Sequence, residues 1–142
     1  MIAVDTNILV YAHRRDSRFH GRAMEVVRSL AEGQASWAIP WSCLHEFLAV
    51  VTHQRIYHPP TPVDAAIAQV EAWLDSPSLV VLQESGEHWS KLREAVAMGA
   101  VGSKIHDGRV YAICVGAGVT ELWTADRDFS RFPIRVTNPL VD

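Results

Sequence analysis

Four acidic residues stand in mostly apolar stretches of this 142-residue chain, namely Asp5, Glu46, Asp107 and Asp126. An unpaired buried carboxylate is costly, so each of them needs hydrogen-bond donors or a cation nearby. Carboxylate oxygens, with few His or Cys residues among them, are the ligands that Mg²⁺ or Mn²⁺ prefers. Their spacing is too irregular for a local ion-binding loop such as an EF-hand. The sequence therefore favours a divalent-metal site that only the fold can assemble.

Each acid also has a plain structural interpretation when it is considered alone. Asp5 or Thr6 could cap the helix that follows, and Asp107 could stabilise a helix N-terminus by roughly 0.3–1 kcal/mol. Glu46 could lie at the boundary of a buried helix face and extend into water, whereas a buried Glu46 requires a cation partner. Asp126 could form a turn after a strand. Only the joint placement of the four residues separates these alternatives from a metal site.

Strand-like and helix-like segments alternate along the chain, and this order predicts the elements that position the acids. The expected strands are Ile2–Val4, Ser36–Ile39, Leu79–Leu82, Glu121–Thr124 and Ile134–Thr137. The expected helices with both ends defined are Thr6–Arg14, Ser17–Glu32, Ser85–Met98 and, after a loop at Gly99–Lys104, Ile105–Ala117. Two more are expected between the second and third strands. One is opened by Pro40 and Ser42 and runs through Val51 towards Tyr57, and the other is capped by Thr61 and ends near Ser76.

Strands separated by helices indicate parallel pairing with right-handed crossovers and helices on both faces. The predicted fold is a three-layer α/β/α sandwich with a mainly parallel central sheet, and residues 1–142 are expected to form one domain. In such a sheet the strand-end acids Asp5 and Asp126 emerge at the same edge. Helices that follow strands begin at that edge too, which brings Glu46 and Asp107 to it. Carboxylates gathered there would repel one another unless a divalent cation lay between them.

Helical spacing also predicts which residues pack inward. Met24 and Trp89 are expected on buried helix faces, and Cys43 and Cys114 are expected to be small core residues, not a disulfide or a zinc site. No run reaches the roughly 20 apolar residues of a membrane span, and the N-terminus lacks the basic region of a signal peptide. The expected location is therefore the cytoplasm.

The net charge is −3, yet basic residues gather between His13 and Arg22, where four arginines accompany one aspartate. A basic segment on an otherwise acidic chain suits a protein that contacts phosphates at one place and holds cations at another. A solvated surface is the simpler interpretation of this charge pattern.

Several motifs carry a resemblance to a known family. They are Asp5-Thr6-Asn7-Ile8-Leu9-Val10-Tyr11-Ala12, an internal Glu46, His106-Asp107 at a helix start, and Thr124-Ala125-Asp126-Arg127-Asp128-Phe129. Together they resemble PIN-domain ribonucleases and, among these, the VapC toxins of bacterial and archaeal toxin–antitoxin pairs. The resemblance covers essentially the whole chain. One departure is Gly108, where the family more often has alanine; glycine there costs roughly 1 kcal/mol of helix propensity.

The resemblance implies Mg²⁺-dependent endonucleolytic cleavage of RNA, with Mn²⁺ as an alternative ion. Asp5 and Asp107 would then be the leading metal ligands, and Glu46 and Asp126 would complete the cluster directly or through water. A metal in such a site activates water and offsets charge on the leaving oxygen. Three further residues are expected to donate hydrogen bonds that orient the carboxylates or the phosphate. These are Thr6, Asn7 and Thr124.

Asp128 is either a fifth acid of the site or a turn residue with Phe129 packed inward, and we favour the turn. Arg14, Arg15 and Arg18 are candidate contacts to RNA phosphates, or equally to an acidic partner. The resemblance further implies a cognate antitoxin protein as partner and a homodimer as the assembled form.

Two other functions are weighed against this one. An aspartyl-phosphate phosphatase also begins with a strand and an Asp, but that chemistry needs a second acid two residues later, and this chain has Asn7 there. A catalytically silent PIN-fold module that binds RNA or protein is the second alternative. The presence of all four acids disfavours it.

Overall fold

The computed structural model describes every residue from Met1 to Asp142 and contains one five-stranded sheet. Its strands are β1 (Ile2–Val4), β2 (Trp37–Pro40), β3 (Leu79–Leu82), β4 (Glu121–Trp123) and β5 (Arg135–Thr137). They lie in the order β3-β2-β1-β4-β5, and every neighbouring pair is parallel. The strands predicted from the sequence are confirmed to within one residue at each end.

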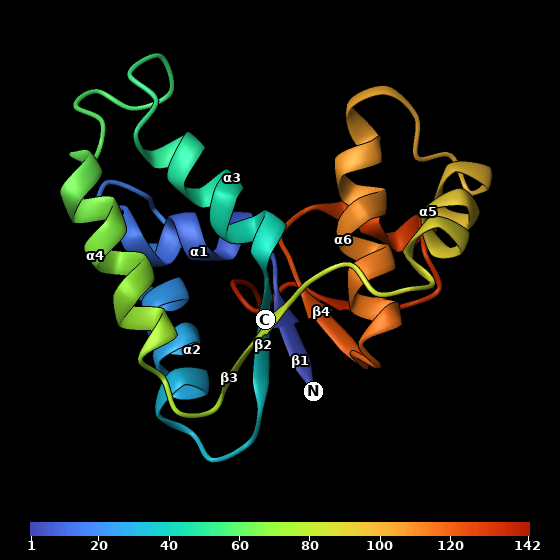
Figure 1. Ribbon diagram of the computed structural model, residues 1–142. Helices are drawn as coiled ribbons and strands as arrows, with labels where there is room; N and C mark the ends of the chain where they lie inside the picture. Colours follow the sequence, from blue (N-terminus) through green and yellow to red (C-terminus); the bar gives the residue numbers. More distant parts are fainter.

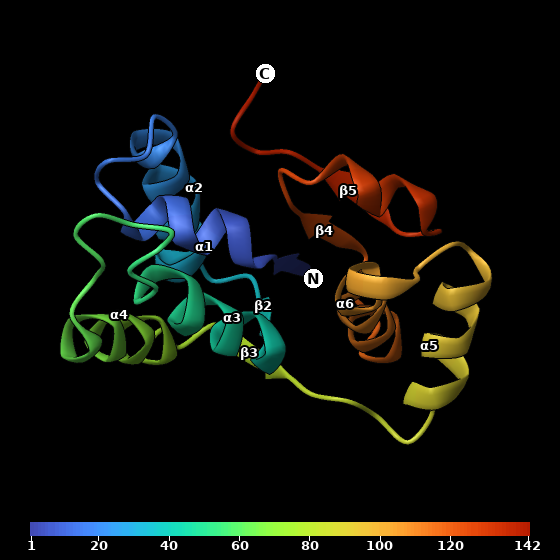
Figure 2. The ribbon, with the colours of Figure 1, turned by 90° about the horizontal axis from the view of Figure 1, so that it is seen from above.

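Helices cover both faces of this sheet. They are α1 (Thr6–His13), α2 (His20–Glu32), α3 (Trp41–Val51), α4 (Val63–Leu74), α5 (His88–Ala97) and α6 (Ile105–Gly116), with short 3₁₀ helices η1 (Gly102–Lys104) and η2 (Arg127–Arg131). Figures 1 and 2 show α1 to α4 gathered on one side of the sheet and α5 and α6 on the other. The predicted three-layer α/β/α sandwich is confirmed.

The strand order creates a crevice beside the central strand β1. From β1 the chain adds β2 and then β3 in one direction; it then passes through α5 and α6 and adds β4 and β5 on the other side of β1. Where strand order reverses in this way, the connections leave opposite faces and ligands bind outside the carboxyl ends of the strands. The residues that follow β1 and β4 therefore meet at the natural binding edge of the sheet.

Apolar side chains fill the two layers between helices and sheet. Trp37 of β2 and Phe47 of α3 are fully buried, and the ring of Phe47 meets that of Trp73 edge to face with centroids 4.8 Å apart. Cys43 and Cys114 are both buried and free, as predicted. No helix is long and apolar enough to cross a membrane.

Three helix boundaries and one cap differ from expectation. α2 begins at His20 instead of Ser17, and α5 begins at His88 instead of Ser85. α3 ends at Val51 without continuing towards Tyr57. Thr61 does not cap α4, because it is buried and its Oγ1 is hydrogen-bonded to His13 Nε2 at 3.1 Å. The Thr61 hydroxyl, which the sequence pattern assigned to the N-terminus of α4, is therefore bonded to the last residue of α1 instead.

Two predicted core residues lie on the surface. Met24 is 41% exposed and Trp89 is 71% exposed. Helical spacing identified an apolar face in each case, but smaller neighbours make the packing contacts: Ala23 is fully buried on α2, and Ala95 is fully buried on α5. Close packing of two helices favours small residues at the point of contact, which leaves the larger side chains outside.

Gly108 has a packing role that the sequence could not reveal. A Cβ at this position would lie 3.1 Å from Ala95 Cβ and 3.2 Å from Ala100 Cβ, tighter than ordinary contact. The missing side chain lets α6 approach α5 and the turn that follows it. Glycine at the departure from the family pattern thus permits this close approach while weakening the helix start that carries Asp107.

Candidate active site

Asp5 lies directly after β1 and is 7% exposed. Its backbone N–H donates to Trp123 O at 3.0 Å and extends the hydrogen bonding between β1 and β4. Its carboxylate accepts hydrogen bonds from the Thr6 N–H and the Thr124 hydroxyl, both at 2.8 Å. Burial raises the pKa of Asp5 from 3.8 to about 6, against the opposing effect of these donors. The predicted capping role is real, but it leaves a carboxylate with no paired cation in the interior.

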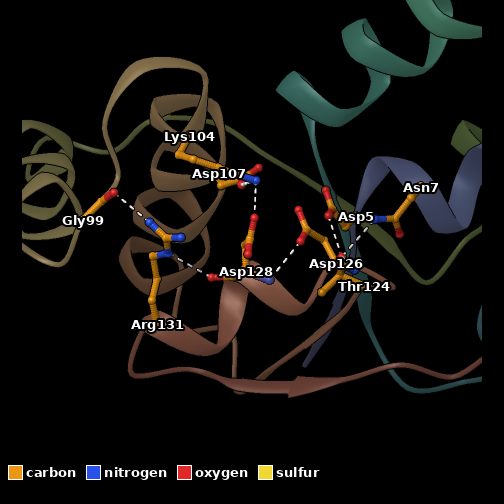
Figure 3. Close-up of polar contacts among 9 residues, drawn as sticks. All are labelled: Asp5, Asn7, Gly99, Lys104, Asp107, Thr124, Asp126, Asp128 and Arg131. Atoms are coloured by element: carbon orange, nitrogen blue, oxygen red, sulfur yellow. Dashed lines mark hydrogen bonds and ion pairs between the residues drawn. The ribbon is translucent and has the colours of Figure 1, made fainter.

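Thr124 fixes the orientation of that carboxylate. It is 1% exposed, and its Oγ1 accepts from Asn7 Nδ2 and from the Asp126 N–H, each at 3.1 Å. With both acceptor positions used, its single proton points to Asp5 Oδ2. Asn7 is held in turn, because its Oδ1 accepts from the Ala125 N–H at 3.1 Å. Figure 3 shows this network connecting the ends of β1 and β4.

Asp126 combines a turn with a position at the site. Its Oδ1 accepts from the Asp128 N–H at 2.9 Å and caps η2, so the predicted turn role is present. Asp128 itself forms an ion pair with Lys104, and Phe129 is buried at 1% exposure. The favoured interpretation of Asp128 as a turn residue with Phe129 packed inward agrees with this arrangement.

Asp107 lies in the first turn of α6, opposite Asp126. Lys104 Nζ stands 3.8 Å from Asp107 Oδ2 and also pairs with Asp128 (Figure 3). Burial and the neighbouring charges of Asp126 and Asp5 raise the pKa of Asp107, while Lys104 acts in the opposite direction. Lys104 ends η1, in a stretch that the sequence pattern predicts as a loop, so its place beside Asp107 was not predicted. Its position three residues before Asp107 was the available signal, because such residues are neighbours on a helical turn.

Glu46 projects from α3 and is exposed, although it faces the same hollow. Burial of its carboxylate and the charge of Asp107 raise its pKa, and nearby His106 lowers it. No ion pair forms at Glu46, so the cation partner expected for a buried Glu46 is missing. Glu46 is exposed, as expected for a residue at the boundary of a buried helix face, and it still lines the same pocket as the other three acids.

One pocket of about 230 Å³ brings the predicted acids together. Asp5, Glu46, Asp107 and Asp126 all line it, each from a different part of the chain. Two of the predicted polar donors, Thr6 and Asn7, also line the pocket, while Thr124 lies beneath it. Sequence reasoning missed the contributions of His106, Tyr11 and Tyr57 to the same walls.

The carboxylates that line the pocket are suitable ligands for a divalent cation, although they stand too far apart to coordinate one as placed. No three carboxylate, imidazole or thiol side chains stand close enough together to hold a metal ion as placed. The donor set is nevertheless made of oxygens, and Thr6 Oγ1 is buried without a hydrogen-bond partner. A buried polar atom with no partner is rare, and it indicates a ligand or water that belongs there. Burial is the main cause of the raised pKa values of Asp5, Glu46 and Asp107, and repulsion between these carboxylates adds to it. An ion bound in this pocket would relieve that repulsion.

The predicted phosphate contacts lie outside this pocket. Arg14 Nη2 bonds Asp16 Oδ2 at 2.6 Å, and the guanidinium lies 4.1 Å from the centroid of the Tyr57 ring. Arg15 and Arg18 are exposed on the segment between α1 and α2. Arg14 is thus engaged within the protein, and the guanidinium of Arg18 lies 4.6 Å from the centroid of the Phe19 ring, so Arg15 is the least engaged of the three.

The chain matches the family model described as PIN domain over residues 2–134. It is 35% identical over 142 residues to ribonuclease VapC43 of Mycobacterium tuberculosis, a match that covers 99% of this chain and 96% of that protein.

Solved structures show the same fold at low sequence identity. VapC20 of Mycobacterium tuberculosis, a toxin that cleaves the sarcin-ricin loop, superposes with a TM-score of 0.68 at 18% identity over 92% of this chain and 93% of its own. VapBC2 from Rickettsia felis, solved with a DNA fragment from their promoter, superposes with a TM-score of 0.67 at 19% identity. That match covers 96% of this chain and 98% of the other. With the family model spanning nearly all of the sequence and a relative of this identity aligned from end to end, the chain belongs to the PIN-domain family, as a VapC-type member.

Proposed function

We propose that this chain is a Mg²⁺-dependent endoribonuclease that hydrolyses phosphodiester bonds in RNA, and the toxin of a type II toxin–antitoxin pair. The observation that carries this proposal is the convergence of Asp5, Glu46, Asp107 and Asp126 on one pocket at the binding edge of the sheet. Support for RNA as the substrate comes from the family and from the ribonuclease VapC43. Mn²⁺ is an alternative ion, because it accepts the same oxygen ligands.

In this mechanism Asp5 and Asp107 would hold the ion, and Glu46 and Asp126 would complete the ligand set directly or through water. When bound, the ion supplies Lewis acidity that activates water and offsets charge on the phosphodiester. The chain's own residues supply orientation. The Thr124 proton keeps Asp5 Oδ2 in one direction, and Asn7 keeps the Thr124 hydroxyl in place. No histidine or serine nucleophile takes part.

The test compares cleavage of a labelled RNA by the wild type, Asp5→Asn and Asp107→Asn, with Mg²⁺ and with EDTA. Loss of the hydrogen-bond partners of a metal ligand alone costs about 10- to 100-fold, so each substitution should lower the rate by at least that factor. Asp75→Asn is the matched control, because Asp75 is an exposed residue just after α4. Equal cleavage by the wild type and Asp5→Asn would show that this pocket is not the active site.

We also propose a cognate antitoxin as the protein partner, a homodimer as the assembled form and the cytoplasm as the compartment. Likeness to VapBC2 of Rickettsia felis supports the partner, and two free buried cysteines suit a reducing compartment. Co-expression with a small open reading frame found immediately upstream should yield a complex that co-purifies. Light scattering on the chain alone should give twice the 15.8 kDa mass. A monomer at all concentrations contradicts the dimer.

A further inference from the structure

A second hollow of about 340 Å³ adjoins the acidic pocket and differs from it in charge. Ser42 and His45 of α3 line one side of it, and Arg109 of α6 lines the other. The two hollows share Glu46, His106 and Val110, so they form one continuous depression between α3 and α6. Figure 1 shows these two helices standing on either side of the central strands. Four carboxylates line the first hollow, whereas the second has a guanidinium and two imidazoles beside the single carboxylate of Glu46, which both hollows share.

The donors of the second hollow are held in place but not used up. Arg109 Nε donates to Glu84 Oε1 at 2.7 Å, and Arg109 Nη2 forms an ion pair with the same oxygen at 2.5 Å. Glu84 therefore orients the guanidinium, and Nη1 is the nitrogen left without a hydrogen bond. His45 and His106 are exposed and line the same hollow. The Ser42 hydroxyl, in contrast, is buried and has no hydrogen-bond partner. A buried polar group normally finds a partner, so Ser42 indicates that a ligand or water belongs here, and Arg109 and the two imidazoles beside it supply donors for an anionic ligand.

An aromatic surface lies next to these donors. Trp41 is 40% exposed at the start of α3, and its ring packs against that of His45 with centroids 6.3 Å apart and planes tilted by 35°. Proteins that bind single-stranded nucleic acid combine cationic grooves with exposed aromatic rings on which bases stack. The exposed ring of Trp41 thus lies beside Ser42 and His45 on α3, with His106 and Arg109 facing them from α6.

We propose that the second hollow is the subsite for the nucleotide next to the scissile phosphate of a single-stranded RNA. Arg109, His45 and His106 bind its phosphate, and the adjoining base stacks on Trp41. Glu84 is a positioning residue that directs Arg109. This assignment rests on the proposed ribonuclease function, which places the scissile phosphate in the acidic pocket. It also gives the RNA-binding role to a wall between α3 and α6 in place of the arginines that follow α1.

The experiment measures binding separately from cleavage, in an Asp5→Asn background. A short fluorescein-labelled single-stranded RNA of mixed sequence is titrated by fluorescence anisotropy over a series of salt concentrations. Arg109→Gln should weaken binding by roughly five- to twentyfold and reduce the slope of log Kd against log salt by about 0.7, the value for one phosphate contact to a single strand. Arg109→Lys should keep most of the slope.

Two controls match these changes on other surfaces. Arg28→Gln removes an exposed arginine from α2, and Trp89→Ala removes an exposed tryptophan from α5. Both should bind RNA as the background protein does, whereas Trp41→Ala should weaken binding by roughly tenfold and Trp41→Phe should retain it. Equal salt slopes for Arg109→Gln and Arg28→Gln would overturn the phosphate subsite, and equal losses for Trp41→Ala and Trp89→Ala would overturn the stacking surface.

The two proposals fail in different ways. If the wild type cleaves RNA with Mg²⁺ but Arg109→Gln leaves the salt slope unchanged, the subsite is wrong and the ribonuclease function stands. If the wild type does not cleave RNA but Arg109→Gln changes binding as expected, the binding wall stands and the catalytic function is wrong. In the otherwise wild-type enzyme, Arg109→Gln should raise KM with little change in kcat, the signature of a contact made equally before and during the reaction.

Discussion

Asp5 and Asp107 share one pocket, yet the protein holds them in opposite ways. Asp5 is 7% exposed and is stabilised by neutral donors, the Thr6 N–H and the Thr124 hydroxyl. The Asp107 side chain is 25% exposed and has a cation, Lys104, at 3.8 Å. Burial without a counter-charge makes ionisation of Asp5 costly for the folded state. Burial and the neighbouring carboxylates raise the pKa of Asp107 too, but there Lys104 acts against them. The Asp5 carboxylate is therefore fixed by hydrogen bonds and costly to ionise, whereas the Asp107 carboxylate is partly exposed to solvent and lies beside a lysine.

The largest expected effect tests this cost at Asp5 through pH. A pKa raised from 3.8 to about 6 means that the folded state binds the proton more tightly than the unfolded state. The resulting stabilisation is fully present below pH 3.8 and is lost as pH rises through about 6. It amounts to about 3 kcal/mol in full, and roughly half of it should return between pH 8 and pH 5.

Urea denaturation of the metal-free protein in EDTA measures this dependence, with Asp5→Asn as the reference. Because the amide carries no charge, the variant should lack this part of the pH dependence. Its stability at any one pH is a separate matter, because the amide has a single acceptor oxygen for the two donors Thr6 N–H and Thr124 Oγ1. Identical pH profiles for the two proteins would show that burial does not strain the Asp5 carboxylate.

The next effect concerns the donor that faces Asp5. Thr124→Val keeps the shape of the side chain but removes the hydroxyl, so Asp5 Oδ2 loses its buried donor and Asn7 Nδ2 loses its acceptor. Leaving such groups unpaired costs about 1–3 kcal/mol of unfolding free energy, measurable by urea denaturation. RNA cleavage should fall by about 10- to 100-fold. Thr124→Ser restores the hydroxyl and should recover most of both; no recovery would mean that packing, not the hydrogen bond, matters here.

The smallest effect is expected on the Asp107 side. Lys104→Gln removes a positive charge that competes with a divalent ion, so Mg²⁺ or Mn²⁺ should bind roughly two- to fivefold more tightly in calorimetric titrations. Stability should change little, because the ion pairs are solvent-exposed. Lys91→Gln is the matched control, since Lys91 pairs with Glu94 at the same three-residue spacing on α5. Weaker metal binding by Lys104→Gln would reverse the role assigned to Lys104.

The sequence was informative where geometry follows from secondary structure alone. Asp5 and Asp126 were expected at one edge because the carboxyl ends of parallel strands always meet there. It was misleading where helical spacing placed several residues on one apolar face without showing which of them is buried. Trp89 lies on the predicted face of α5 but is exposed, and Ala95 is the residue buried there. The basic segment predicted Arg14 as a contact to RNA phosphates, but Arg14 forms an ion pair with Asp16.

The amino-acid sequence by itself determined the alternation of strands and helices, the parallel sheet and the presence of four acids beside its strand ends. These are local properties, set by the period of apolar residues and by chain direction. Only the tertiary structure decided which donor faces each carboxylate, that Lys104 pairs with Asp128, and that His45 and Arg109 share a wall. Such contacts join residues far apart in the chain or depend on side-chain direction, and no local pattern records either.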